Sequence, residues 1–266
     1  TMPGYFLFAG ELAESLTTIT LPNSVTRLGT RCLQNGGKLT EINLPSELTY
    51  VGELSFGWCE SLEAIELPES IDSLGSSAFE GCKLLAQVEI PEEVSYIGKF
   101  LFQDCESLSE VSLPSTMREI SFATFKGCTS LEELDLPEML RTIGVSAFEG
   151  CTSLSEIQLP PLMRTIEHDA FNGCEALTSV TIQSMAMETI GDQAFMNCKA
   201  LEEIMIPAGV KRIGGNAFSG CESLASIVLP SKLKTLMGGA FARTAITEVT
   251  IPDGCEEILY GAFANC

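Results

Sequence analysis

Residues 62–82 read LEAIELPESIDSLGSSAFEGC, and residues 85–105 read LAQVEIPEEVSYIGKFLFQDC. Both stretches carry Leu, Ile or Val at matching positions, then a Pro, and later a Phe three residues before a Cys. This Phe returns every 23 residues, apart from two intervals that differ by one residue, at Phe56, Phe79, Phe102, Phe125, Phe148, Phe171, Phe195, Phe218, Phe241 and Phe263. A fixed period of this length is the signature of a repeat architecture.

Eleven copies of the unit align from Leu16 onward, and the last copy is cut short at Cys266. In each copy, alternating apolar residues before the Pro predict a short strand with one buried face. The spacing of A-F-x-x-C predicts a 3₁₀ or helical turn that points the Phe and the Cys inward. One copy cannot bury these residues alone, so the copies must stack as rungs around a shared core. The pattern predicts an α/β solenoid, mainly of short parallel strands with turns and 3₁₀ or helical turns.

The repeat resembles the leucine-rich repeat superfamily. More narrowly, it resembles the BspA-like (Treponema-type) surface-antigen family, whose unit reads L-x-x-I-x-L-P-x-x-V-x-x-I-G-x-x-A-F-x-x-C. The resemblance covers about residues 16–266 and implies a right-handed superhelix with 23-residue rungs. Members of that family occur on bacterial surfaces and in protist genomes, and some resemble adhesins that bind host proteins. The resemblance does not name a partner, because fold and function separate readily.

The repeat also predicts the domain organisation. Residues 16–266 form a single leucine-rich repeat solenoid of about eleven rungs. Residues 1–15 break the register, since Phe8 stands eight residues before Leu16 instead of six. They are either a worn first rung or an N-terminal cap. No cap is evident after the truncated last rung, so we expect the chain to be a segment of a longer protein.

Charge excludes several classes of partner. The 266 residues include 36 Asp plus Glu against 15 Lys plus Arg, a net charge of −21. Nucleic acid and anionic membrane surfaces are therefore not expected as partners, because both are bound mainly through Lys and Arg. No apolar run approaches the ~18 residues of a transmembrane helix, and direct membrane insertion is not expected.

The residues that could carry chemistry occupy structural positions. Of the eleven Cys, nine occur once per rung, and these are called the Cys ladder. None of the eleven forms a C-x-x-C pair. We expect buried, reduced thiols in the core, with Cys32 and Cys255 also in core positions. His168 precedes Cys174 by six residues, and the two could form a catalytic dyad. However, Cys174 is one of the Cys that recur once per rung, and His168 is expected in a solvated turn. The sequence predicts no enzyme, no cofactor and no metal site.

Binding is expected on the strand residues that point away from the core, which form the concave face of such a solenoid. Neither outward column contains a Lys or an Arg. The densest acidic cluster is Glu110, Glu133, Asp135 and Glu156, and an apolar pair follows at Met205 and Val228. This face suits a basic protein ligand or, as alternatives, divalent cations, or it serves solubility alone.

The chain departs from the repeat at an insertion and carries a column of basic residues. The inserted stretch 184–187 is either a tolerated loop or a contact site, with Met187 taking the inward position. The basic column, interrupted by Glu188, is expected at a lateral edge, paired with nearby acids: Arg118, Arg141, Arg164, Lys211 and Lys234. The overall charge opposes a sulfated polysaccharide there.

The sequence thus predicts a non-enzymatic protein-binding module, part of a surface or secreted adhesin-like protein in an extracellular location. The alternative is an intracellular scaffold, cytoplasmic or organellar, within a larger assembly of a bacterium or protist.

Overall fold

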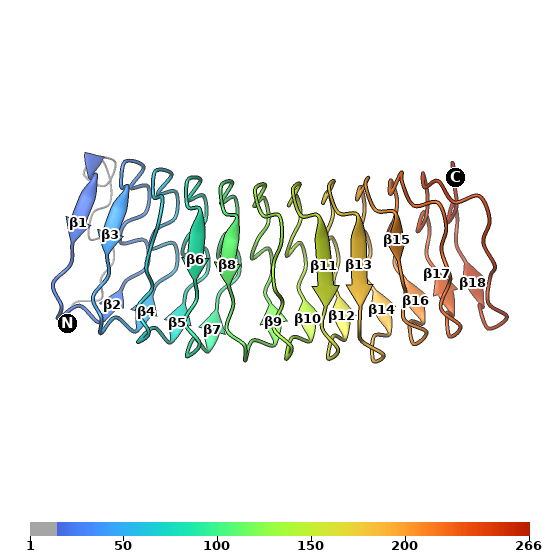
Figure 1. The fold of residues 1–266 in the computed structure, drawn as a ribbon, viewed down its shortest axis with the longest axis horizontal. Coiled ribbons are helices and arrows are strands. Elements are labelled where there is room, and N and C mark those ends of the chain that lie inside the picture. Colours follow the sequence, from blue (N-terminus) through green and yellow to red (C-terminus); the bar gives the residue numbers. More distant parts are fainter. Residues whose placement is uncertain (1–14) are drawn as a thin grey trace. The chain divides into compact units, whose positions relative to one another are not determined.

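The computed structural model describes residues 15–266, which divide into two compact units. The first unit holds the described residues up to Met117 together with Ser121–Leu134, and the second holds Arg118–Ile120 with Asp135–Cys266. Each unit is a parallel-strand solenoid built from stacked rungs (Figure 1), and the turns of the two units together number about ten. The single domain over residues 16–266 stays a prediction. The predicted cap or worn rung lies, apart from Ser15, outside the described residues.

In the first unit, strands form on both sides of the Pro in most repeats, whereas the repeat of Pro68 has only an isolated bridge at Ala64 before it. Strands before the Pro pair as β1 with β3 and β6 with β8, and strands after it form one parallel sheet in the order β2-β4-β5-β7. The first group comprises β1 (Thr18–Thr20), β3 (Glu41–Asn43), β6 (Gln87–Glu89) and β8 (Glu110–Ser112). The second comprises β2 (Arg27–Leu28), β4 (Tyr50–Val51), β5 (Ser73–Leu74) and β7 (Tyr96–Ile97).

The second unit follows the same plan. Three strands before the Pro pair in the order β11-β13-β15, and seven strands after it pair in the order β18-β17-β16-β14-β12-β10-β9. The first sheet holds β11 (Glu156–Leu159), β13 (Ser179–Ile182) and β15 (Glu203–Ile204). The second holds β9 (Glu119–Ile120), β10 (Thr142–Ile143), β12 (Thr165–Ile166), β14 (Thr189–Ile190), β16 (Arg212–Ile213), β17 (Thr235–Leu236) and β18 (Glu257–Ile258).

Strand register equals the repeat period. Val88 of β6 is opposite Val111 of β8, and Ile143 of β10 is opposite Ile166 of β12, so buried residues of neighbouring rungs stack on one another. The strands before the Pro were predicted. Those after it were missed, because two residues ahead of the Gly are too few to show a period of two.

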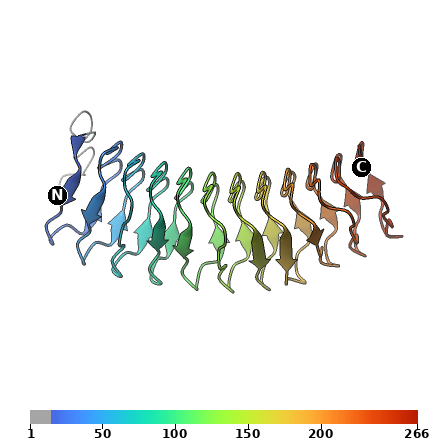
Figure 2. The ribbon, with the colours of Figure 1, turned by 45° about the horizontal axis from the view of Figure 1, so that its top comes forward.

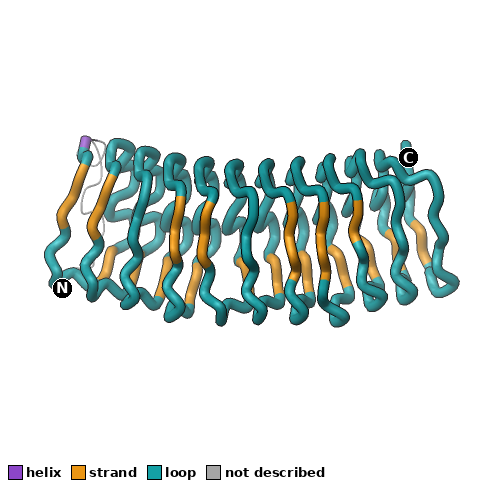
Figure 3. Tube along the Cα trace, in the orientation of Figure 1, coloured by secondary structure: helices purple, strands orange, loops and turns teal. Residues whose placement is uncertain are grey.

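The 3₁₀ or helical turn predicted at A-F-x-x-C is wrong. From residue 16 onward the described chain forms strands, turns and bends and no helix (Figure 3). Backbone N–H groups in this segment alternate between two kinds of acceptor. Ala78 and Cys82 donate within the rung, to the carbonyl oxygens of Gly75 and Phe79 at 3.3 and 3.1 Å. Phe79 donates to Leu101 of the next rung at 3.0 Å.

Backbone dihedrals explain why a helix cannot form there. Ser77 and Gly81 have φ of 56° and 71°, and each is the third residue of a turn closed within its rung. Positive φ at that position is the mark of a type II turn, whereas a helix needs negative φ at every residue. The segment is therefore a chain of tight turns that points every second N–H at the next rung. Within each unit, the rungs follow one another in chain order (Figure 2).

The Phe column forms the core of each unit, as predicted. In the first unit, Phe56 and Phe79 stack with ring centroids 5.4 Å apart and planes 6° apart. In the second, Phe195 and Phe218 stack at 5.3 Å and 7°. All nine Phe of the column from Phe56 to Phe241 are fully buried. These ring separations lie within the 4.5–7 Å range of favourable aromatic pairs.

In most rungs the Cys contacts the Phe of the rung before it. The Cys82 thiol donates to the carbonyl oxygen of Phe56 at 3.1 Å, and the Cys221 thiol to that of Phe195 at 3.2 Å. The same carbonyl of Phe56 accepts the N–H of Cys59 at 3.0 Å. A small apolar side chain with a weak donor suits this site, because it fills the core and supplies a second hydrogen bond.

Replacing one ring of the column should destabilise the second unit locally. Phe195→Ala removes a fully buried ring that stacks on both sides, and we expect a loss of about 3–5 kcal/mol. Because rungs contact only their neighbours, unfolding in urea followed by circular dichroism should broaden or split. Val228→Ala, at an exposed position, is the matched control and should unfold like the parent. A Phe195→Ala curve that overlays the parent curve would contradict this account of the core.

Candidate binding surfaces

An acidic groove lies on the outward face of the first unit. It has a volume of about 410 Å³, and its walls come from three successive rungs that include β6 and β8. Four carboxylates line it, together with Ile65, Leu67, Val88, Pro91, Gln87 and Ser112. The four are Glu66, Glu69, Glu89 and Glu110. All are exposed to solvent, and no Lys or Arg lines the groove.

The groove contains one of the predicted site residues and three that the predicted site omitted. Glu110, in β8, lies opposite Gln87 of β6. Glu66 and Glu89 belong to the outward columns that the sequence shows. Glu69 comes from the turn after the Pro, and no strand period could place it there. The groove therefore depends on a turn as well as on the outward columns of the strands.

The rest of the predicted acidic cluster is divided between the units. Glu133 is exposed in the first unit, and Asp135 and Glu156 are exposed in the second. Glu156 opens β11, opposite Ser179 of β13. A joint role for these carboxylates stays a prediction.

The predicted apolar pair faces outward. Met205 and Val228 have 81% and 85% of their surface exposed, whereas Ile204 and Ile227 beside them are buried. The alternation confirms that both side chains point away from the core of the second unit. Their role in binding stays a prediction.

The inserted stretch keeps the core intact. Met187 is fully buried, as predicted. Ser184 is buried too, and its hydroxyl donates to the carbonyl oxygen of Met163 at 2.5 Å and accepts the N–H of Ala186 at 3.1 Å. Met185 projects with 77% of its surface exposed. The extra residue is accommodated in the turn, where a side-chain hydrogen bond replaces part of the usual turn.

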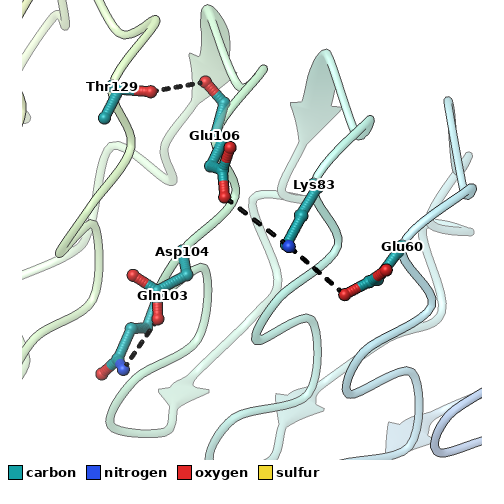
Figure 4. A network of polar contacts seen from close by, with 6 residues as sticks. All are labelled: Glu60, Lys83, Gln103, Asp104, Glu106 and Thr129. Carbon is teal, nitrogen blue, oxygen red and sulfur yellow. Dashed lines mark hydrogen bonds and ion pairs between the residues drawn. The ribbon is translucent and has the colours of Figure 1, made fainter.

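Several Lys side chains lie beside acidic side chains of adjacent rungs. Lys83 lies between Glu60 and Glu106, with Nζ–Oε1 distances of 3.3 and 3.9 Å (Figure 4). The predicted lateral pairing is confirmed at Lys211, whose Nζ is 3.0 Å from Glu188, and at Lys234, whose Nζ is 2.5 Å from Glu256. Such exposed pairs stabilise the fold by ~0–1 kcal/mol each.

His168 and Cys174 are held in separate environments. The Nδ1 atom of His168 lies 3.7 Å from Asp192 Oδ2, and half of the ring is exposed. The thiol of Cys174 is fully buried and donates to the carbonyl oxygen of Phe148 at 3.1 Å. Burial raises the pKa of this thiol well above its ordinary value, which is the opposite of what a nucleophilic Cys needs.

Thiol positions match the prediction in most rungs but not at the end of the chain. All eleven Cys are free, and nine are buried, including Cys32. Cys255, predicted in the core, is half-buried, and Cys266 is exposed. Among the residues from 15 onward, no three His, Cys, Asp or Glu side chains are grouped so as to hold a metal ion. The same residues contain no helix long and apolar enough to cross a membrane.

The sequence profile described as "BspA type Leucine rich repeat region (6 copies)" matches residues 5–94, 72–199 and 146–266. The chain belongs to this family. The prediction made from the repeat is thereby confirmed. A comparison with curated proteins finds no match.

Solved structures agree with the family assignment. A leucine-rich repeat protein from Bacteroides ovatus is 26% identical, with 95% of this chain and 77% of that chain covered and a TM-score of 0.62. A leucine-rich cell surface protein from Faecalibacterium prausnitzii is 28% identical, with 94% and 77% covered and a TM-score of 0.62. A T. pallidum leucine-rich repeat protein is 33% identical over 53% of this chain and 66% of that chain, with a TM-score of 0.50.

Thiol accessibility gives a direct test of the ladder. In the native 266-residue chain, a maleimide should label Cys255 and Cys266 and leave the nine buried thiols unmodified, because burial blocks the reagent and keeps the thiol protonated. After denaturation all eleven should react. Mass spectrometry counts the labels, and rapid native labelling of several ladder thiols would show that the rungs do not enclose them.

The buried thiols also predict a loss of stability in alkali. Burial raises the pKa of Cys59 and Cys221 to about 12, whereas an unfolded thiol has a pKa of about 8.5. The folded chain then binds more protons than the unfolded chain. Each such thiol therefore contributes stability that is complete below about pH 8.5 and is lost as the pH rises toward about 12. Urea unfolding between pH 8 and 11 should show the free energy of unfolding falling.

Removing one thiol isolates its share of this effect. Cys221→Ala should reduce the steepness of the decline by about 1.4 kcal/mol per pH unit. Cys255→Ala is the control, since that side chain is only half-buried. Equal slopes for the parent and Cys221→Ala would mean that the ladder thiol ionises as readily in the folded chain as in the unfolded chain.

Proposed function

We propose that the protein is a non-enzymatic protein-binding module of the cell surface, whose ligand is a basic segment of another protein docked in the acidic groove of the first unit. The observation that carries the proposal is the groove itself. Four exposed carboxylates share a hollow of about 410 Å³ that no Lys or Arg lines.

Charge and shape together favour a basic peptide segment. The net charge of −21 draws a basic ligand toward the chain and repels nucleic acid, and local carboxylates then fix its orientation. Apolar walls at Ile65, Leu67, Val88 and Pro91 suit the methylene stems of Lys and Arg, which pack on apolar surface while the charged head meets a carboxylate.

A second contact is proposed at Met205 and Val228 in the second unit. An exposed apolar pair on adjacent rungs lowers solubility unless a partner covers it. Met side chains adapt to varied surfaces. In this proposal the acidic groove governs association and the apolar pair slows dissociation.

The proposed location at the cell surface is based on the description of a similar protein. The F. prausnitzii protein that this chain resembles over 94% of its length is described as a leucine-rich cell surface protein. The absence of an enzymatic role is proposed from the fold, since repeat solenoids of this kind present surfaces for binding rather than enclosed sites. The buried, protonated state of the Cys174 thiol accords with this view.

Selection from a random library of displayed peptides tests the proposal. Peptides that bind the native chain should be rich in Lys and Arg. Their dissociation constants should rise at least about tenfold for Glu89→Lys, which reverses one groove carboxylate. Glu53→Lys makes the same change of charge at an exposed residue of the first unit outside the groove and should change binding by less than about twofold.

Two results would overturn the proposal. The first is a set of selected peptides without basic residues. The second is an equal loss of binding for Glu89→Lys and Glu53→Lys, which would reduce the groove to one part of a diffuse charge. Met205→Asp tests the second contact separately. It should raise the dissociation rate of a partner protein more than the association rate falls.

A further inference from the structure

Three arginines stand on successive rungs of the second unit, each two residues before a buried Ile of the seven-stranded sheet. The backbone N–H of Arg141 donates to the carbonyl oxygen of Arg118 at 2.8 Å, and that of Arg164 donates to Arg141 at 2.8 Å. The rungs are therefore in register at this column. The three side chains leave the same edge of the unit about 4.8 Å apart, and together they are called the arginine row.

The arginine row lacks the acids that neutralise the rest of its column. Further along, Lys211 pairs with Glu188 at 3.0 Å, and Lys234 pairs with Glu256 at 2.5 Å. Within residues 15–266, none of the three arginines forms an ion pair. Three exposed acids near the row do not pair with it either: Glu119 follows Arg118 directly, Glu138 precedes Arg141 by three residues, and Glu188 pairs with Lys211. Elsewhere in the chain a stacked cation such as Lys83 has acids on both sides (Figure 4).

Like charges on adjacent rungs repel, so an unneutralised row is a cost to the fold. In a chain with 36 acidic residues, an acid in place of one of the three arginines would lower that cost. A guanidinium group binds oxyanions through a planar pair of N–H donors, and it is less strongly hydrated than an ammonium group. The row is therefore arranged to meet anionic groups from outside the chain.

An apolar stripe runs beside the arginine row. Met139 and Leu162 are exposed and hold the same place in equivalent turns, each two residues before an arginine of the row. On the next rung, Met185 projects from the inserted turn with 77% of its surface exposed. Charge and apolar surface thus follow each other in parallel lines over several rungs, a combination that a purely solubilising surface does not require.

The spacing of the arginine row favours one kind of ligand over the others. Rungs recur about every 4.8 Å, close to the 5.4 Å pitch of an α-helix, and side chains one helical turn apart have Cβ atoms about 5–6 Å from each other. An extended strand presents same-face side chains about 6.6–6.8 Å apart and loses step with the row by the third rung. A polyanion such as nucleic acid or a sulfated polysaccharide is disfavoured, because the net charge of −21 repels it along its whole length.

We propose that the arginine row and the apolar stripe form a docking site for an amphipathic helix of a protein partner, with acidic side chains one turn apart facing the row and apolar side chains facing the stripe. This mode of binding lays a helix along an apolar surface and uses charge to fix its register. The site is separate from the acidic groove, so the two surfaces take ligands of opposite charge.

The test uses a defined peptide. A 22-residue capped helix carries Glu at three positions one turn apart and Leu along the adjacent line. A control peptide has the same composition with Glu and Leu distributed around the helix. Fluorescence anisotropy in about 0.15 M salt, where screening limits long-range repulsion to about 8 Å, should show binding of the patterned peptide at least roughly tenfold tighter than that of the control.

Variants of the protein assign the binding to the site. Arg141→Gln and Leu162→Ser should each weaken binding of the patterned peptide by at least roughly tenfold. Lys199→Gln removes one positive charge from an exposed residue of the second unit that pairs with Glu175, and it should change binding by less than about twofold. Because Arg141 is half-buried, the exposed Arg164 provides a second charge variant, and thermal unfolding verifies that each variant is folded.

Three outcomes would overturn the proposal. Equal affinity for the control and the patterned peptide would make the interaction one of charge alone. Equal effects of the row variants and Lys199→Gln would remove the row from the binding surface. Heparin binding through the row, with no binding of the patterned peptide at millimolar concentration, would replace the helix with a sulfated polysaccharide. None of these results depends on the acidic groove, so Glu89→Lys should bind the patterned peptide as the parent does.

Discussion

Every second backbone N–H in the turns before the ladder Cys is donated to the following rung, so a rung cannot complete its own hydrogen bonds. Phe79 donates to Leu101, and Gly81 donates to Gln103 at 2.7 Å. Buried backbone donors without partners are costly, and this requirement forces neighbouring rungs to keep the same length between equivalent residues. The period of 23 residues is the consequence. Where one residue is added, it enters the turn at 183–187, and the Ser184 hydroxyl accepts a local hydrogen bond from Ala186 and donates to Met163 of the preceding rung.

The same register builds the core. Rungs that are held in step by backbone hydrogen bonds place identical side chains on top of one another, and each column then needs a residue that packs against its own copy. Phe does so by ring stacking, with the planes of Phe171 and Phe195 only 2° apart. Cys does so by donating its thiol to the carbonyl oxygen of a Phe in the preceding rung. Thr244, which replaces the ladder Cys in one rung, donates instead to Phe241 of its own rung at 3.0 Å.

The register of the rungs does not restrict which residue types occupy the outward columns. Their backbone is fixed, and their side chains do not hold the rungs together, so they are the positions where this chain can differ from its relatives without losing the fold. The acidic groove and the arginine row use this freedom in opposite ways. Both gain from the stacking, because residues of equal charge on successive rungs are brought within about 5 Å of each other, and a partner meets several of them at once.

The sequence by itself determined the repeat, the stacking, the inward Phe and Cys, the outward Met205 and Val228, and the buried Met187. Each of these follows from the period and from apolar alternation within one rung. Tertiary structure decided the rest. A spacing of three between Phe and Cys fits a 3₁₀ turn and a type II turn equally, and the choice depended on acceptors such as the Leu101 carbonyl in the next rung. Glu69 joined the groove, and Met139 and Leu162 flanked the arginine row, because equivalent turns of successive rungs lie side by side once the rungs stack, and the period of two in the strands does not extend into these turns.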